Sequence, residues 1–417
     1  TLVPLLGTTG AFAGQALSLE QAVSTALEKN LDVLSAREEL AKAEGKLVYA
    51  RSGLFPTISV NGSVSRRNEE STKPEDENVG NVSLSQYLYA GGVISAGAEQ
   101  ARQTQAKARQ DLRNAEEVVS MKVFDAYVTV LLRKADEETA RDALSYYENS
   151  AKELGKRFEL GLAKKLDYSR AVQQRESASA DYTRAKNNLS TARIDLLTLL
   201  RMPPDADVEI TGNLEAEAAS VNRDESVVRA LAQRPDLQGQ KTIAAIQKTA
   251  VDIARGGMRP VVTLSASYQF AYDSTPASSA ADDEWLATVS MKVPVFDGGT
   301  TRGRVMQEQA SLNQAEQAAA KKEEAVRAEV IQAALSVESN YETVGAARKS
   351  LELARENLRL AEVGYREGVN TQLDVLSART TLTEASQALS GALKAYRVAL
   401  AGLWKAEGSL VNRVLNR

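Results

Sequence analysis

The sequence has 417 residues and contains neither cysteine nor histidine. Without cysteine, disulfides, thiolate metal sites and a cysteine nucleophile are excluded. Without histidine, the chain lacks the commonest metal ligand and the usual general base of an enzyme. No other constellation of catalytic residues is found. The sequence therefore predicts no enzyme, no cofactor and no metal site.

Long apolar runs are also missing. No stretch reaches the roughly 18 apolar residues that a membrane-spanning helix needs. The formal net charge of −4 gives no reason to expect nucleic-acid binding. The acidic residues lie mostly among lysines and arginines along helical patterns, which is typical of a solvated helix face.

The first residues resemble the end of an export signal. An apolar piece at 2–6 is followed by Ala11–Phe12–Ala13, which has the A-x-A form of a cleavage site. We interpret residues 1–13 as the remnant of a signal peptide, and a disordered leader is the alternative. Export without a spanning helix or cysteine indicates the envelope of a bacterium.

Alanine-rich helical patterns lead into and out of two short breaks at 160–167 and 367–374, each of which contains a glycine. Before the breaks, apolar residues recur with the alternating spacing of a coiled-coil seam. They are Ala140, Leu144, Tyr147, Ala151, Leu154 and Phe158 in the first copy, and Ala347, Leu351, Ala354, Leu358, Ala361 and Tyr365 in the second. The pattern predicts two hairpins of long helices with matching tips.

Elsewhere the apolar period changes to two, which predicts strand pairs at 57–90 and 261–296. One face of each strand is apolar, and the other is rich in serine, threonine, asparagine and glutamine. The polar segments 66–80 and 273–284 are expected to be the loops that join each pair. A soluble β cap on a coiled coil would show the same alternation and remains an alternative.

Strands of roughly ten residues can cross an outer membrane when tilted. Because the edges of an open four-stranded sheet cannot lie in lipid, the sheet is expected to close with copies of itself. Two copies would give eight strands, and three would give twelve strands around a lumen. The aromatic residues expected at the membrane interface are Tyr87, Tyr89, Tyr268, Phe270, Tyr272 and Trp285.

The same order of segments occurs twice, so the chain is interpreted as a tandem duplication. The predicted parts are the signal remnant 1–13; a first repeat 14–203 with a helix at 18–52, strands at 57–90 and helices at 93–160 and 167–201; an equatorial linker 203–222; a second repeat 223–405 with strands at 261–296 and helices at 300–364 and 374–404; and a C-terminal tail 406–417.

This arrangement resembles the TolC-type outer-membrane efflux protein family. The matching pieces are Gly53–Leu54–Phe55–Pro56 before a strand, Leu88–Tyr89–Ala90–Gly91–Gly92 and Val293–Pro294–Val295–Phe296–Asp297–Gly298–Gly299 after strands, and the two tip motifs. The resemblance implies a mainly α fold with a membrane β-barrel. In it, three chains contribute four strands each to a twelve-stranded barrel, and their helical hairpins form a trimeric α-barrel.

The resemblance implies a homotrimeric channel in the outer membrane of a Gram-negative bacterium, with a long periplasmic extension. Such a channel is the passive exit duct of a tripartite efflux pump or a type I secretion system. Its implied partners are outer-membrane lipid, a periplasmic adaptor (membrane fusion) protein and an inner-membrane RND or ABC transporter. The sequence leaves open whether drugs, metal ions or proteins pass.

The resemblance also implies a gate at the periplasmic tips. Asp374 matches the first acidic residue that narrows the pore, and a second such residue of the family falls at Ser377. Tyr365 and Asp167 match a hydrogen-bonding pair that holds the closed state. From the residues alone, each aspartate could instead be the N-cap of the helix that follows its turn.

Adaptor docking is implied for Leu160, Gly161, Leu162, Gly368 and Val369 in the tips. The two glycines also suit a turn that needs a positive φ, and both roles are compatible. A structural coiled-coil spacer or adhesin with a β cap is the alternative function. Such a spacer has no need of strands that are polar on one face and apolar on the other in both repeats.

Overall fold

The structure, a computed structural model, describes residues 15–67, 75–271 and 284–416. The predicted signal remnant, Tyr272, residues 68–74 of the first predicted loop and residues 273–283 of the second lie outside these residues. The chain divides into two compact units. The tip unit comprises the described residues of 1–35, 113–235 and 324–417, and the sheet unit those of 36–112 and 236–323.

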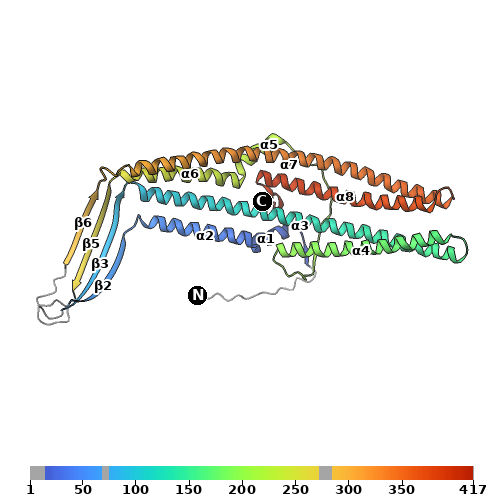
Figure 1. Ribbon diagram of the computed structural model, residues 1–417, viewed down its shortest axis with the longest axis horizontal. Coiled ribbons are helices and arrows are strands. Elements are labelled where there is room, and N and C mark those ends of the chain that lie inside the picture. The colour runs from blue at the N-terminus through green and yellow to red at the C-terminus, as the bar shows by residue number, and fades with distance from the viewer. Residues whose placement is uncertain (1–14, 68–74, 272–283, 417) are drawn as a thin grey trace. The chain divides into compact units, whose positions relative to one another are not determined.

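The sheet unit contains an antiparallel four-stranded sheet with the order β2-β3-β5-β6, seen side by side in Figure 1. The strands are β2 (Thr57–Arg67), β3 (Glu75–Ala90), β5 (Val261–Ala271) and β6 (Glu284–Lys292). The central pair, β3 and β5, joins the two predicted repeats. The outer edges of β2 and β6 have no strand partner within the described residues.

The predicted alternation produces two chemically different faces. Ser59, Ser83 and Ser267 stand opposite one another across three strands, and Val60, Val82 and Tyr268 do the same on the other face. The apolar face is open, with Val60 72% exposed. Polar and apolar side chains are therefore sorted to opposite sides by a single register, because the side-chain period of a strand is two.

Two strand boundaries differ from the sequence prediction. β3 begins at Glu75, so 75–80, expected in a loop, belong to the strand and pair with β2. Ladder hydrogen bonds to β2 outweigh the weak strand propensity of this polar segment. β6 ends at Lys292, before the expected end at 296, because Pro294 cannot donate to a ladder and restricts the residue before it.

The helices that adjoin the sheet are α2 (Leu31–Ser52), α6 (Pro235–Arg255) with the short 3₁₀ turn Gly256–Met258, and the first parts of α3 (Val93–Glu159) and α7 (Thr300–Arg366). The single helix predicted from Ser18 to Ser52 was wrong, because it is broken into α1 (Leu19–Lys29) and α2. Asn30 lies extended between them and donates its side-chain amide to the Leu199 carbonyl, 3.1 Å away.

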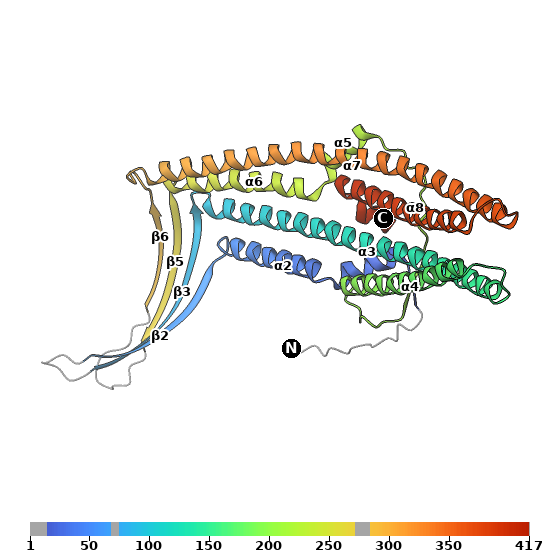
Figure 2. The same cartoon turned by 45° about the vertical axis from the view of Figure 1, so that its right-hand side comes forward.

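The tip unit contains two helical hairpins, α3 with α4 (Lys165–Leu199) and α7 with α8 (Gln372–Glu407). Figure 2 shows each hairpin with its tip. The predicted seams are largely buried: Ala140, Tyr147, Ala151 and Leu154 in α3, and Leu351, Ala354, Leu358 and Ala361 in α7. No helix among the described residues has the length and apolarity to cross a lipid bilayer.

Short elements complete the tip unit at the other end of the hairpins. They are β1 (Gln15–Leu17), which pairs in parallel with β4 (Val208–Ile210), and the helices α5 (Arg223–Gln233) and α9 (Leu410–Val414). Leu410 of α9 packs with Phe124, Val128 and Ala401 in a buried cluster. The segment expected to be a C-terminal tail is therefore part of a hydrophobic core.

Candidate functional site

Both hairpin tips use the same helix-ending turn. In the first, Gly161 has φ 73° and donates its backbone N–H to the Phe158 carbonyl, while Leu162 donates to the Arg157 carbonyl. The second repeats this pattern, with Gly368 at φ 75°. The 5→2 and 6→1 bonds define a Schellman motif, in which a left-handed residue is required and glycine adopts it without strain.

The predicted docking residues lie on the surface of these turns. Leu160 and Leu162 are 73% and 75% exposed, and Val369 is 80% exposed. An ideal Cβ built on either Gly161 or Gly368 would meet no atom within 4 Å. A side chain would therefore have room at both positions. Glycine is required there only because the backbone φ is positive.

The helices that follow the two tips begin differently. Thr371 is the N-cap of α8, and its hydroxyl accepts the Asp374 N–H while the Asp374 Oδ2 accepts the Thr371 N–H at 2.8 Å. Lys164 is the N-cap of α4 and makes no side-chain cap bond. Neither Asp374 nor Asp167 is therefore an N-cap, since both occupy the third helical position.

The capping box also affects the pKa of Asp374. Its Oδ2 accepts a 2.7 Å hydrogen bond from the Thr371 hydroxyl. This bond, with that from the Thr371 backbone, lowers the pKa of the exposed Asp374 carboxyl. Both bonds end on Oδ2, which leaves Oδ1 free to face another group. Ser377, three residues further along α8, is exposed.

The structure does not join the predicted pair Tyr365 and Asp167. Among the described residues, the Tyr365 hydroxyl has no hydrogen bond to Asp167. Instead Tyr365 packs against a buried cluster of Leu358, Ala361 and Val375, at the base of the second tip. Asp167 donates its backbone N–H to the Lys164 carbonyl at 3.1 Å. A hydrogen-bonded lock at this pair is absent from this arrangement.

Tyr146 of α3 is a junction residue that sequence reasoning missed. It packs against the cluster of the second hairpin around Leu358 and Val375, and against the cluster of Tyr147, Ala178 and Leu376. The Arg379 guanidinium lies 4.7 Å from the centre of its ring. Burial and the neighbouring Glu362 carboxylate raise the pKa of Tyr146 to about 12. The one signal in the sequence was an aromatic residue beside the seam position 147.

On the sheet, Tyr89, Tyr268, Phe270 and Trp285 lie on the apolar face, as their registers with Val262, Val82, Gly80 and Tyr268 show. Tyr87 lies opposite Thr263 on the polar face, because the register shifts between Tyr87 and Tyr89. The shift is a β-bulge that turns the two tyrosines to opposite sides. Tyr87 therefore lies on the opposite face from the other described aromatic residues that the sequence predicted for the membrane interface.

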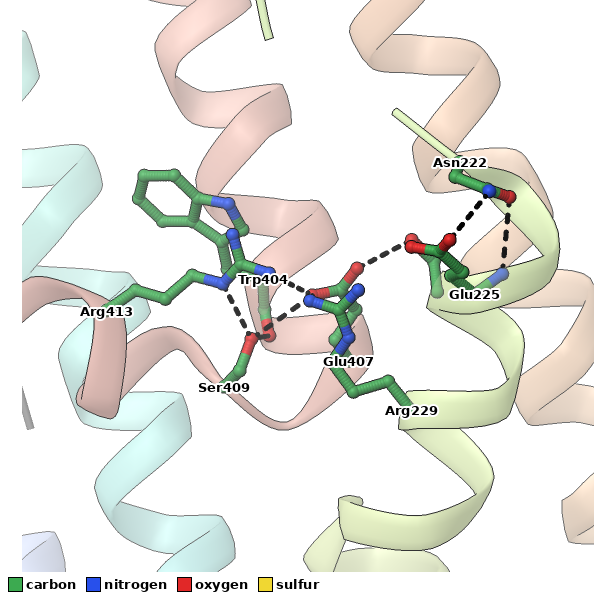
Figure 3. Close-up of polar contacts among 8 residues, drawn as sticks. Asn222, Glu225, Arg229, Trp404, Glu407, Ser409 and Arg413 are labelled. Carbon is green, nitrogen blue, oxygen red and sulfur yellow. Dashed lines mark hydrogen bonds and ion pairs between the residues drawn. The ribbon is translucent and has the colours of Figure 1, made fainter. Parts of the chain in front are cut away.

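A second polar cluster surrounds the end of α8 (Figure 3). The Glu407 carboxylate is 2% exposed and accepts hydrogen bonds from the Ser226 hydroxyl at 2.6 Å and from Arg413 at 2.8 Å. Arg229 lies 3.6 Å away, and the Arg413 guanidinium stands over the Trp404 ring. This network ties α5, α8 and α9 together, which explains why the C-terminal segment is ordered rather than a tail.

Glu117 of α3 caps α9 in the same region. Its carboxylate accepts the backbone N–H groups of Leu410 and Val411 at 3.2 Å and 3.4 Å. Burial raises the pKa of Glu117 to about 7, against the lowering effect of these two bonds. Within 15–67, 75–271 and 284–416, no three acidic side chains gather in a way that could hold a metal ion.

Comparison with known proteins places these features in one family. The sequence model described as "Outer membrane efflux protein" matches residues 22–200 and 227–409. The chain is 25% identical over 403 residues to a probable efflux pump outer membrane protein, TtgC, of Pseudomonas putida, covering 94% of this chain and 83% of that one. It is 24% identical over 417 residues to the outer membrane protein TolC of Vibrio cholerae, covering 94% and 91%.

Solved structures show the same fold. The outer membrane channel CmeC of Campylobacter jejuni superposes with a TM-score of 0.83 at 18% identity, covering 94% of this chain and 86% of that one. The open state of the MtrE channel of Neisseria gonorrhoeae gives 0.82 at 22% identity, covering 94% and 89%. With the family model matching most of both repeats, the chain belongs to the outer membrane efflux protein family.

Proposed function

We propose that this chain is one of three identical subunits of an outer-membrane exit duct, which conducts cargo passively after an inner-membrane transporter has loaded it. The observation that carries the proposal is the open sheet. Its apolar face is exposed and its two edges are unpaired among the described residues. A lipid-facing sheet is stable only when every edge is paired. Pairing β6 of one copy with β2 of the next achieves this closure.

The placement of the aromatic residues supports a membrane position. Tyr89 pairs with Val262 near the N-terminal end of β5, and Phe270 lies near the C-terminal end of the same strand. The two levels are eight residues apart on β5, roughly 26 Å at about 3.3 Å per residue. This length is close to the ~25 Å apolar band of outer-membrane barrels, which is flanked by aromatic girdles.

The tips are the proposed contact with a periplasmic adaptor. Leu160, Leu162 and Val369 remain largely exposed in the described chain. Both turns present these apolar side chains with the same backbone geometry. Three copies of Asp374 around one axis would place three carboxylates in a constriction and favour cations. The capping box that holds Asp374 at the start of α8 supports a fixed position for each carboxylate of this ring.

The test is the assembly and conductance of the purified protein. We expect a trimer in detergent that resists heating and forms cation-preferring channels in planar bilayers. A monomer or an assembly without conductance would contradict the duct and favour the spacer or adhesin. Restoration of drug resistance in a strain that lacks its own exit duct, only when an adaptor and transporter are also present, would establish the partners.

A further inference from the structure

A β-bulge places one aromatic side chain on the polar face of the sheet. Tyr87 and Tyr89 are two residues apart on β3, so regular alternation would put both on one face. Leu88 is the extra residue of the bulge. It leaves Tyr87 opposite Thr263 on the polar face and turns Tyr89 to the apolar face. Tyr87 is 50% exposed, and its hydroxyl has no hydrogen-bond partner among the described residues.

Lys292 lies on the same polar face. On β6, Ser290 stands opposite Thr263 and Lys292 stands opposite Val261, so all four share one side of the sheet. The Lys292 side chain is exposed, and it forms no ion pair within the described part of the chain. The acidic residue on this face of β6 is Glu284, at the other end of the strand, roughly 26 Å away at about 3.3 Å per residue. The ammonium group is therefore an uncompensated positive charge.

The phenol ring and the ammonium group are close enough to contact one small molecule. From Tyr87, the register crosses β5 at Thr263 and reaches β6 at Ser290, two residues before Lys292. Two strand spacings and two residues along the strand put the Cα atoms of Tyr87 and Lys292 roughly 12 Å apart. The Thr263 and Ser290 hydroxyls lie between them and make no hydrogen bond to another described residue. All four residues belong to the sheet unit.

Closure of the sheet would repeat this pair around a lumen. In the strand order β2-β3-β5-β6, one strand separates β3 from β6 (Figure 1). Joining β6 to β2 of the next copy also leaves one strand between β6 and the β3 of that copy. Three copies would therefore alternate Tyr87 and Lys292 at every second strand. The polar face of a membrane barrel is its interior, so both side chains would line the passage.

We propose that Tyr87 and Lys292 form a binding site on the lumen wall for small aromatic anions, that is, planar aromatic molecules that carry a carboxylate or sulfonate. The proposal rests on the duct function proposed above and names a chemical class of cargo for it. The phenol ring would stack on the aromatic part of the cargo, and the ammonium group would attract its anionic group. Because the site lies in a water-filled passage, binding would be weak enough for the cargo to leave again.

The experiment is single-channel recording of purified trimers in planar bilayers, with naphthalenesulfonate as the probe. Two further probes each lack one feature: cyclohexanesulfonate has the charge without the aromatic ring, and naphthalenemethanol has the ring without the charge. We expect naphthalenesulfonate to reduce the current at a lower concentration than either of the others. The quantity compared is the concentration of probe that halves the current.

The variants separate the contributions of the ring and the charge. Tyr87→Leu removes the ring and should raise the half-blocking concentration of naphthalenesulfonate about tenfold, the order expected for loss of a stacking platform. Lys292→Gln removes the charge and should raise it about threefold, because a solvent-exposed ion pair contributes less. Tyr87→Phe and Lys292→Arg keep the ring and the charge, so both should stay close to the wild type.

The bulge supplies a matched control. Tyr89→Leu makes the same substitution two residues along β3, on the opposite face, and should leave the block by naphthalenesulfonate unchanged. Heat-resistant trimers on gels check that each variant assembles. If Tyr87→Leu fails to assemble, Tyr87→Thr replaces it, because threonine is favoured in strands.

The outcomes separate this inference from the function on which it rests. A wild-type protein that forms no channels would overturn the duct itself. Channels that all three probes block equally, or that naphthalenesulfonate does not block, would overturn the site and leave the duct standing. So would a block that weakens in only one of Tyr87→Leu and Lys292→Gln, or that weakens as much in Tyr89→Leu. A weaker block in the first two variants with no change in Tyr89→Leu supports the site.

Discussion

The two tips share a turn but differ in the helix that follows it. Both α3 and α7 end in a Schellman motif on a glycine. After that turn, α8 begins with a capping box made by Thr371 and Asp374, whereas α4 begins at Lys164 without a side-chain cap. The second tip therefore begins its helix with a capping box that contains an acidic residue, and the first begins its helix at two lysines without a side-chain cap.

In the proposed duct, this difference suits the duplicated halves to different tasks. A carboxylate that lines a pore must keep its position, and the capping box would hold Asp374 in place at the second tip. Lys164 and Lys165 at the first tip are exposed beside Leu162 and Leu166, which suits contact with a partner. In the proposed duct, the acidic constriction lies at the second tip, and both tips keep the glycine turn that is proposed for docking.

The largest expected effect comes from disrupting the glycine turn that both tips share. Gly161→Pro or Gly368→Pro forces φ near −65° where about +75° is needed, which should cost about 3 kcal/mol or more in the turn. Drug efflux should be lost in both variants while trimers persist on gels. Gly391→Ala, in the interior of α8, is the control and should retain efflux. Full efflux in both proline variants would remove the docking role.

Much of this comparison was accessible from sequence, and part of it was not. The seams, the strand faces and both glycine turns follow from periodicity and from glycine's freedom at positive φ. The break at Asn30 and the early start of β3 at Glu75 depend on long-range hydrogen bonds to Leu199 and β2, which no local pattern reveals. Tyr146 was missed because its partners, Glu362 and Arg379, lie more than two hundred residues away in sequence.

The second effect is on ion selectivity. Asp374→Asn should lower the cation preference of the channel in bilayers several-fold and weaken block by trivalent cations, because one ring of charge is removed and Ser377 supplies no second. Asp167→Asn, at the same helical position of the first tip, is the matched comparison and should change selectivity less. Equal changes in the two variants would contradict the division of tasks.

A smaller effect tests the caps themselves. Thr371→Ala removes the N-cap of α8 and should destabilise its first turn by about 1 kcal/mol. Lys164→Ser supplies the missing cap of α4 and should stabilise that turn by a similar amount. Hydrogen exchange at 372–376 and at 165–169 should move in opposite directions in the two variants. Unchanged protection at both sites would show that the caps do not control the tips.

The smallest effect is on pH dependence. The pKa of Asp374 is lowered by its bonds to Thr371, so its contribution is fully present above the usual value near 3.8 and is lost as pH falls through the lower folded value. Exchange protection at 372–376 should therefore hold from pH 7 to pH 4 and decline only in stronger acid. A decline that begins at pH 6 would mean that Asp374 is not held in this way.

The central claim is that three copies close one sheet by joining β6 to β2, and cysteine cross-linking tests it directly. The chain has no cysteine, so introduced pairs have no competing thiol. Val60→Cys on β2 can be combined in turn with Ala287→Cys, Val289→Cys or Met291→Cys on β6, all on the apolar face. In at least one pair, oxidation in membranes should give a non-reducing gel ladder that ends at the trimer. No cross-link in any pair, or a ladder that ends at the dimer or continues beyond the trimer, would contradict the account.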